Sequence, residues 1–225
     1  DIVINPVFSS EEITDLFSFA TESKIVVKID GDNTNCPADW LQEAKNKADL
    51  VVGIESSAKN ELEKYQSFLK AFDINSAELH PNIIIDKESE NFAKEFFNTF
   101  IKNNELTIAL FPFANHFHKE FQNFEQLIQS FSNYNFIILG GKEKIALSER
   151  FNNYKNCFNL VGRTNLLELA AIIKKCNLYV GADSSGAHIA CSQKIPNIVI
   201  LGGGHFGRFF PYSKYTSVVC KPMNC

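Results

Sequence analysis

The sequence of 225 residues contains no apolar run long enough to cross a lipid bilayer. Its apolar runs, for example residues 83–85 and 198–201, are far too short for that. It also has no charged and then apolar leader at its start, as a secretory signal would have. The hydrophobic share of 45% is ordinary for a globular protein, so we expect a packed core.

The six cysteines form no C-x-x-C pair and fall at irregular positions, namely Cys36, Cys157, Cys176, Cys191, Cys220 and Cys225. Several lie in segments that we expect to be buried. We therefore predict reduced thiols in a cytoplasmic protein.

Carboxylates are missing from the last part of the chain. No Asp or Glu follows Asp183, whereas four basic residues do: Lys194, Arg208, Lys214 and Lys221. The net charge of −4 is therefore the sum of about −8 on residues 1–183 and +4 on the residues after them. A small positive region on an acidic protein suits a compact anionic ligand better than nucleic acid, which the rest of the surface would repel. Chance clustering of the charges is the alternative.

Short apolar segments alternate with longer amphipathic segments along the chain, which is typical of parallel sheets covered by helices. The predicted strands cover residues 2–5, 25–29, 50–54, 82–85, 107–111, 136–139, 178–180 and 197–201. The predicted helices cover about residues 11–21, 58–72, 89–102, 120–130, 143–151, 165–175 and 185–193. The fold class is therefore predicted to be α/β.

Glycine is scarce at first, because only Gly31 and Gly53 precede residue 140. The regular alternation of strands and helices begins at Thr107, and the predicted helix before it, residues 89–102, resembles a connector between domains. We therefore predict a partial α/β domain over residues 1–100 and a nearly complete doubly wound domain over residues 101–225. The chain opens on a strand without Met, so we expect the first domain to be incomplete.

The polar segment GADSSGAH follows a predicted strand. Asp183, Ser184 and Ser185 would begin a helix beyond the carboxyl end of that strand, where open α/β sheets bind ligands. Free backbone N–H groups and the helix dipole favour a phosphate there. Gly186 would let the ligand approach closely, and His188 would face it from one turn inside the helix. Simple N-capping by Asp183 or Ser184 is the alternative.

Two further strand ends carry basic groups. The loop GGGHFGR could wrap its amides around an oxyanion, with Arg208 as a bidentate partner, or it could be a flexible loop. In LFPFANHFHKEF, Lys119 could reach a phosphate. His116 and His118 have a spacing seen in some metal sites, but no third ligand lies nearby in the sequence, so we predict no metal.

The predicted strand over residues 136–139 ends in LGGKE. Glu143 could accept hydrogen bonds from a ribose, or it could only complement a helix dipole from the first turn. Together the strand ends offer the phosphate donors, the ribose acceptor and the space that a nucleoside diphosphate needs.

The stretch ADSSG is also close to the G-x-S-x-G turn of serine hydrolases, with Ser184 as the nucleophile. Ala182 replaces the first glycine of that motif, however, and no acid follows the serine as the usual order of the triad requires. A hydrolase using Ser184 remains an alternative.

The stretch YVGADSSGAHIA, residues 179–190, resembles the D-S-G-x-x-H-L-A signature of family 9 glycosyltransferases, the heptosyltransferase-like enzymes. Four other stretches are similar to that family in the same order: LFPFANHFHKEF, FIILGGKE, NLVGRTNLLELAAIIKKCNLYVGADS and ILGGGHFGRFFPY. The opening DIVINPVFSSEEITDLF resembles a strand-helix unit of the family's first domain, so the resemblance covers nearly the whole chain.

This resemblance implies a GT-B fold of two Rossmann-like domains and a glycosyltransferase that needs neither a metal nor another cofactor. The C-terminal domain would bind a nucleotide sugar such as ADP-heptose. The N-terminal domain would hold the acceptor, a lipopolysaccharide core or a similar lipid-linked glycan. The resemblance also implies a cytoplasmic enzyme, peripherally associated with the inner face of the membrane, and no nucleic-acid partner. A non-catalytic module that binds nucleotide sugars is the alternative.

The family's site for the donor diphosphate and sugar is matched by Asp183, Ser184, Ser185, Gly186 and His188. Lys119 matches the basic phosphate contact and Glu143 the acidic nucleoside contact, and Arg208 is a further phosphate candidate. The family's catalytic Asp would lie upstream of Asp1, so no catalytic base is assigned. Here the glycine falls one place later than in D-S-G, and Phe113 stands where the family usually has glycine.

Overall fold

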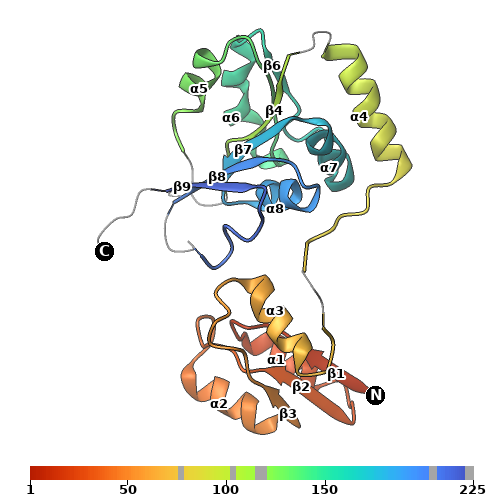
Figure 1. The fold of residues 1–225 in the computed structure, drawn as a ribbon, viewed down its shortest axis with the longest axis vertical. Coiled ribbons are helices and arrows are strands. Elements are labelled where there is room, and N and C mark those ends of the chain that lie inside the picture. The colour runs from red at the N-terminus through yellow and green to blue at the C-terminus, as the bar shows by residue number, and fades with distance from the viewer. Residues whose placement is uncertain (76–78, 102–104, 115–120, 203–206, 221–225) are drawn as a thin grey trace. The chain divides into compact units, whose positions relative to one another are not determined.

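The computed structural model describes residues 1–75, 79–101, 105–114, 121–202 and 207–220. The chain divides into two compact units, Asp1–Leu79 and His80–Cys225. Each unit contains its own sheet of parallel strands (Figure 1). The prediction of an α/β fold is therefore confirmed.

The first unit is built on a three-stranded sheet of order β1-β2-β3. Its strands are β1 (Ile2–Asn5), β2 (Ile25–Ile29) and β3 (Leu50–Val52), and its helices are α1 (Glu12–Phe19), α2 (Ala38–Lys47) and α3 (Glu61–Lys70). The buried core is small and consists of Val27, Ile29, Val52 and Phe68. Helix α3 begins at a capping box in which Asn60 and Glu63 satisfy each other's backbone N–H groups.

A polar cluster is buried in the first unit, and we call it the Asp15 cluster. The carboxylate of Asp15 accepts hydrogen bonds from Lys28 Nζ, from Asn5 Nδ2 at 2.9 Å and from Trp40 Nε1 at 3.2 Å. Lys28 also donates to Ser10 Oγ at 2.9 Å. Asp15 and Lys28 are almost completely buried, so each charge depends on these partners.

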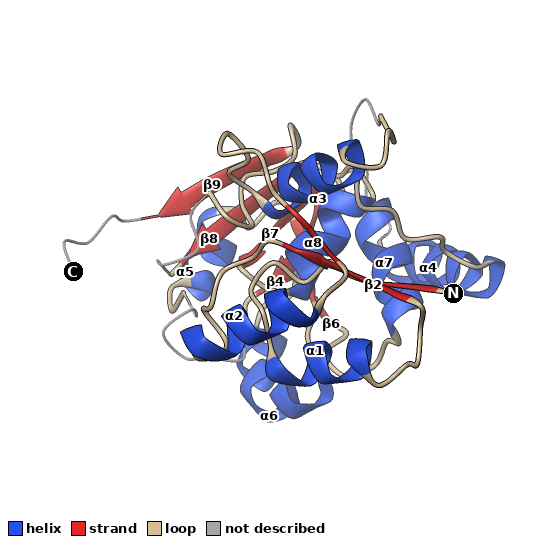
Figure 2. Ribbon diagram, turned by 90° about the horizontal axis from the view of Figure 1, so that it is seen from below, coloured by secondary structure: helices blue, strands red, loops and turns tan. Residues whose placement is uncertain are grey.

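The second unit contains a six-stranded, all-parallel sheet of order β6-β5-β4-β7-β8-β9. Its strands are β4 (Thr107–Phe111), β5 (Asn135–Ile138), β6 (Cys157–Asn159), β7 (Leu178–Ala182), β8 (Asn197–Leu201) and β9 (Thr216–Cys220). This is the 3-2-1-4-5-6 order of a doubly wound dinucleotide-binding sheet. The order reverses between β4 and β7, and Figure 2 shows β4, β7, β8 and β9 following one another across the sheet.

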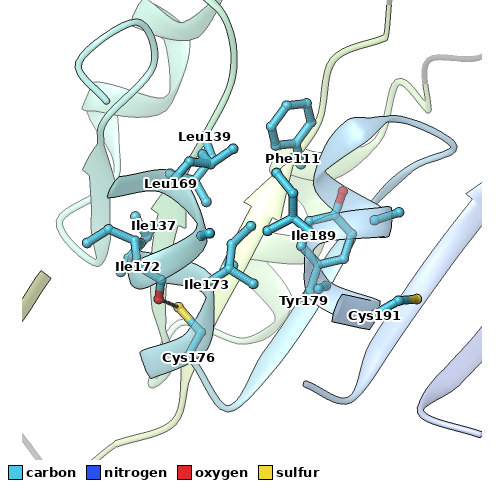
Figure 3. Close-up of a cluster of buried hydrophobic side chains, with 14 of the residues drawn as sticks. Phe111, Ile137, Leu139, Leu169, Ile172, Ile173, Cys176, Tyr179, Ile189 and Cys191 are labelled. Carbon is cyan, nitrogen blue, oxygen red and sulfur yellow. Dashed lines mark hydrogen bonds between the residues drawn. The ribbon is translucent and has the colours of Figure 1, made fainter. Parts of the chain in front are cut away.

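Helices cover both faces of this sheet (Figure 1). One face is covered by α4 (Lys87–Phe100), α7 (Leu166–Lys175) and α8 (Ser185–Ser192), and the other by α5 (Phe124–Ser130) and a helical segment, residues 142–153, that includes α6 (Ile145–Ser148). Side chains alternate along β4, so Ala109 and Phe111 join the first core cluster (Figure 3), while Ile108 and Leu110 join the second.

The predicted strand over residues 82–85 is wrong, because these residues form no strand. Ile83 and Ile85 instead pack against the core of the second unit, and Ile83 O accepts a hydrogen bond from Gln193 Nε2 at 3.0 Å. Ile84 is 83% exposed. The apolar run therefore docks onto a helix-covered core rather than entering a sheet.

The sequence pattern does not predict α2, β6 or β9. Helix α2 has one buried residue, Ala44, and so lacks a clear apolar face. Strand β6 is three residues long, and the last two residues of the edge strand β9, Val219 and Cys220, are exposed. Short and solvated segments carry little hydrophobic signal.

The compact units divide between Leu79 and His80, whereas the sequence placed the domain boundary near residue 100. Helix α4 packs against α7 and contributes Ala93 and Phe96 to the core of the second unit. Lys174 and Glu90 form an exposed ion pair across the same contact at 3.1 Å. The assignment of an acceptor role to the first part and a donor role to the second stays a prediction.

Candidate functional site

The candidate site lies at the carboxyl ends of β4 and β7, where the strand order reverses. Open α/β sheets bind their ligands in the crevice at this position. Strand β7 ends at Ala182, and Asp183 and Ser184 lead directly into α8. The motif singled out in the sequence therefore occupies the topological switch point.

Ser184 is the N-cap residue of α8, but in the described part of the chain its side chain makes no capping hydrogen bond. Its hydroxyl donates instead to Ala182 O at 3.2 Å. The capping interpretation of Ser184 is therefore wrong. The first N–H groups of a helix have no partner within the helix and attract anions. Ser185 is exposed and Asp183 and Ser184 are half-buried, so a ligand can reach this turn.

Gly186 has a different role from the one predicted. A Cβ atom at this position would lie 2.7 Å from Phe111 Cδ2 and 2.7 Å from the Tyr179 hydroxyl. A Cβ at Gly181 would lie 2.4 Å from the same hydroxyl. The missing side chain at Gly186 thus allows α8 to rest on the strand residues, and it does not open space for a ligand.

His188 lies one turn inside α8, half-buried among aromatic rings of the segment that precedes β9. Its Nδ1 is 2.9 Å from the Tyr212 hydroxyl, and its ring stacks on Tyr212 at a centroid distance of 5.7 Å. The ring of Phe210 lies 4.7 Å away. Burial lowers the pKa of His188, and the charge of Asp183 opposes this in part, so the imidazole is neutral at neutral pH.

Tyr212, the last residue of the stretch ILGGGHFGRFFPY, contacts His188 and is not among the residues predicted from the sequence. Burial raises the pKa of its phenol, so the hydroxyl keeps its proton. If the phenol donates to Nδ1 of the neutral His188, the imidazole proton lies on Nε2. Tyr212 then fixes which nitrogen of His188 can donate to a ligand.

Arg208 joins this aromatic group from the loop after β8. Its guanidinium carbon lies 5.0 Å from the ring centroid of Phe209, and that ring meets His188 edge-on at 6.4 Å. Arg208 and His188 thus both contact the ring of Phe209, and the phosphate role of Arg208 stays a prediction. Residues 203–206 of the loop lie outside the described residues.

Glu143 lies in the helical turn Lys142–Lys144, which follows β5, and is exposed. Its carboxylate folds over Gly141, where a Cβ atom would lie 2.4 Å from either carboxylate oxygen. The next residue, Lys144, donates to Ala114 O at 2.8 Å and so ties the loop after β5 to the loop after β4. No pattern in the sequence predicts this contact between the two loops.

Lys119, His116 and His118 lie outside the described residues, so the basic contact predicted at Lys119 stays a prediction. The start of their loop is described, and Phe113 there is 2% exposed. Its ring fills the space above Gly140, where a Cβ atom would lie 3.0 Å from Phe113 Cδ2, and it meets Phe151 edge-on. The phenylalanine that departs from the family pattern is thus a core residue.

Metal-ligating side chains do not gather in the described part of the chain, where no group of three or more His, Cys, Asp or Glu is placed to hold an ion. Among the described residues, none of the helices has both the length and the apolar character that a membrane crossing needs.

Most of the sequence is similar to an enzyme family. The model of glycosyltransferase family 9 (heptosyltransferase) matches residues 51–225. The chain is also 39% identical over 61 residues to the lipopolysaccharide core heptosyltransferase OpsX of Haemophilus influenzae. That stretch makes up 27% of this chain and 18% of OpsX.

Solved structures show the same fold at low sequence identity. A family 9 glycosyl transferase from Veillonella parvula superposes with a TM-score of 0.81 at 18% identity, over 98% of this chain and 62% of that one. The E. coli heptosyltransferase WaaC, solved with ADP, gives 0.71 at 13% identity, over 99% of this chain and 67% of WaaC. The E. coli ADP-heptose lps heptosyltransferase II superposes with a TM-score of 0.67 at 17% identity, over 97% of this chain and 67% of that one.

These likenesses confirm the predicted α/β fold of GT-B type with Rossmann-like units. The chain spans 62% of the Veillonella protein and a far smaller part of OpsX. Because the family model covers most of the chain, we conclude that it belongs to glycosyltransferase family 9.

Proposed function

We propose that the chain serves the transfer of a heptose from an ADP-linked donor to a glycan acceptor of the lipopolysaccharide core or a similar lipid-linked kind. One observation carries the proposal: at the switch point of the sheet, α8 begins without a side-chain cap from Ser184, and His188 lies one turn inside it. The names of OpsX and of the WaaC complex with ADP support the choice of donor and acceptor.

The transfer breaks the bond between the anomeric carbon and the donor's phosphate oxygen, and the electron pair leaves with the nucleoside diphosphate. The acceptor hydroxyl forms the new bond and loses its proton to a base. Negative charge grows on the leaving diphosphate, so donors already aimed at it accelerate the step. Each such donor contributes ~3 kcal/mol in well-formed oxyanion sites.

In this chain the donors would be the first N–H groups of α8, the hydroxyls of Ser184 and Ser185, and the imidazole of His188. The Tyr212 hydroxyl at Nδ1 would leave the Nε2–H of His188 for a phosphate oxygen. Arg208 and Lys119 would add positive charge from the two neighbouring loops.

The two acids of the site would bind hydroxyl groups rather than phosphate. Glu143 is exposed in the helical turn that follows β5 and would accept hydrogen bonds from the ribose. Asp183 would accept hydrogen bonds from the sugar. Neither is proposed as the base that deprotonates the acceptor, and the catalytic residue stays unassigned.

By the family resemblance, we propose that the reaction needs no metal and no other cofactor. We place it in the cytoplasm, at the inner face of the membrane, where the chain would associate peripherally with a lipid-linked acceptor. No nucleic-acid partner is proposed.

A non-catalytic module for nucleotide sugars is the second candidate, because the same described residues would bind the donor without a base. Binding without transfer by the complete protein would favour it. A serine hydrolase is disfavoured by the geometry of Ser184. Its backbone is extended, with φ of −153°, and its hydroxyl bonds to Ala182 O, while His188 Nδ1 faces Tyr212. Labelling of Ser184 by a fluorophosphonate would support the serine hydrolase interpretation.

Calorimetric titration of the chain with ADP, UDP and GDP tests the proposal. We expect ADP to bind, and we expect His188→Ala and Lys119→Ala to weaken binding about tenfold or more, since hydrogen bonds to charged groups contribute about 1.5–3 kcal/mol. His80→Ala and the exposed Lys155→Ala serve as matched controls and should bind normally. If no nucleoside diphosphate binds, or if His188→Ala and Lys119→Ala bind like the controls, the assignment fails.

A further inference from the structure

Tyr179 carries a hydroxyl that the packing of the second unit does not satisfy. The residue lies on β7, beneath α8, and its side chain is 0% exposed. Among the described residues, no hydrogen-bond partner meets its hydroxyl oxygen. A buried polar atom without a partner is costly and uncommon in native proteins, so this one requires an explanation.

The unpartnered hydroxyl lies directly under the turn that opens α8. Its oxygen would be 2.4 Å from a Cβ atom at Gly181 and 2.7 Å from one at Gly186, so the two glycines close over it from both ends of the turn. Figure 3 shows the hydroxyl directed toward the ribbon of α8, close to Phe111. A valine or phenylalanine could fill this part of the core without bringing a polar atom here.

Ser184 is the polar neighbour of this hydroxyl within the turn. Burial raises the pKa of Tyr179 far above its ordinary value, and the hydroxyl of Ser184 offsets a part of that rise. Ser184 at present donates its proton to Ala182 O at 3.2 Å, which is long for a bond between two oxygens. A serine hydroxyl can donate one hydrogen bond and accept two, so Ser184 can also accept one from Tyr179.

We propose that Tyr179 is a positioning residue, whose buried hydroxyl donates to Ser184 Oγ when Ser184 turns its own proton to a phosphate of the ligand. This inference rests on the proposed function, because it takes a nucleoside diphosphate as the ligand at the start of α8. No covalent bond changes; two hydroxyl protons reorient.

The resulting chain of hydrogen bonds runs from Tyr179 through Ser184 to the phosphate. Hydrogen bonds in such a chain polarise one another, so the Tyr179 proton makes Ser184 a better donor to the anion. The arrangement also explains why a tyrosine is tolerated in the core: its hydroxyl has no partner among the described residues, and it gains one when Ser184 turns toward the ligand.

A double-mutant cycle with Tyr179→Phe and Ser184→Ala tests the inference, with ADP affinity measured by calorimetry and thermal stability measured alongside. We expect Tyr179→Phe to weaken ADP binding about fivefold, in line with the loss of one hydrogen bond. In the Ser184→Ala background the same change should have no further effect. The melting temperature of Tyr179→Phe should stay equal or rise, because the variant loses an unpaired buried polar atom.

The matched control is Tyr154→Phe. The hydroxyl of Tyr154 accepts a hydrogen bond from Gln129 Nε2 at 3.2 Å on the surface, so the variant should bind ADP normally. Unchanged ADP affinity in Tyr179→Phe would overturn the inference, and so would an equal loss in both backgrounds. A wild-type chain that does not bind ADP would instead overturn the proposed function, so the two failures are distinct.

Discussion

The two units of the chain each bury polar groups, but they treat them differently. In the Asp15 cluster of the first unit, Asp15 accepts three hydrogen bonds, and Lys28 is paired with it and with Ser10. Beneath α8 in the second unit, Tyr179 is equally buried and, among the described residues, unpartnered. The helix above it also begins without a side-chain cap from Ser184.

This difference separates two reasons for placing polar atoms inside a protein. A network whose members satisfy one another holds helices and strands together and needs nothing from outside. The first N–H groups of a helix have no partner within the helix and attract anions. We infer that the first unit uses its buried charges for stability, and we propose that the second unit binds a ligand at the start of α8.

The largest expected effect comes from breaking the satisfied network. Lys28→Met leaves the buried carboxylate of Asp15 without its cation and should destabilise the first unit by about 3–5 kcal/mol in urea unfolding. Lys70→Met removes an exposed ion pair with Glu55 and should cost less than about 1 kcal/mol. Similar small losses in both variants would mean that the Asp15 cluster is not what holds the first unit.

The next effect tests how tightly α8 rests on the strands. Gly186→Ala should cost about 1–3 kcal/mol through overpacking, because its Cβ would meet Phe111 and the Tyr179 hydroxyl at 2.7 Å. Adding Tyr179→Phe should recover part of that loss, since one of the two clashes disappears. Gly53→Ala has open space around its Cβ and should be nearly neutral. Thermal unfolding measures all three, and a neutral Gly186→Ala would contradict the packing described here.

A smaller effect is expected on binding. Tyr212→Phe removes the hydrogen bond to Nδ1 of His188 while keeping the stacked ring, so ADP affinity should fall about fivefold. Unfolding of the same variant should change little. ADP affinity equal to that of the wild type would show that Tyr212 does not orient His188.

The smallest effect is a pH dependence of stability. Burial lowers the pKa of His188 in the folded chain, so the unfolded chain takes up the proton first as the pH falls. His188 therefore contributes stability above about pH 6.5, its ordinary pKa, and this contribution is lost as the pH drops toward the folded pKa. The stability of His188→Gln should fall less steeply between pH 7 and pH 5. If the free energy of unfolding of the wild type and of His188→Gln fell equally with pH, His188 would not be buried as described.

Much of the fold could be predicted from the sequence, because hydrophobic periodicity marks buried strands such as β4 and β8 plainly. The hydrophobic pattern fails to predict strands where an apolar segment is not in a sheet, or where a strand in a sheet is partly exposed. Residues 82–85 are apolar because they dock on the core, and β9 pairs with β8 although it is partly solvated. Helix α4 looks like a connector along the chain, yet its apolar face packs against α7.

The candidate site was predictable in position but only partly in detail. Glycines, serines and a histidine after a strand indicate a candidate ligand turn at Ser184, and the structure has that turn at the switch point of the sheet. The roles proposed for Tyr179 and Tyr212 could not be predicted from the sequence, because an aromatic residue in a strand or before one ordinarily indicates packing. Gly186 was misread because sequence cannot tell whether a missing side chain faces a ligand or the core.

The most direct test is a crystal structure of the chain with ADP. We predict that the diphosphate lies at the start of α8, with its oxygens at hydrogen-bonding distance from Ser184 Oγ and the first N–H groups of the helix. A complex with ADP bound elsewhere, or with the start of α8 filled by the protein's own side chains, would contradict the account.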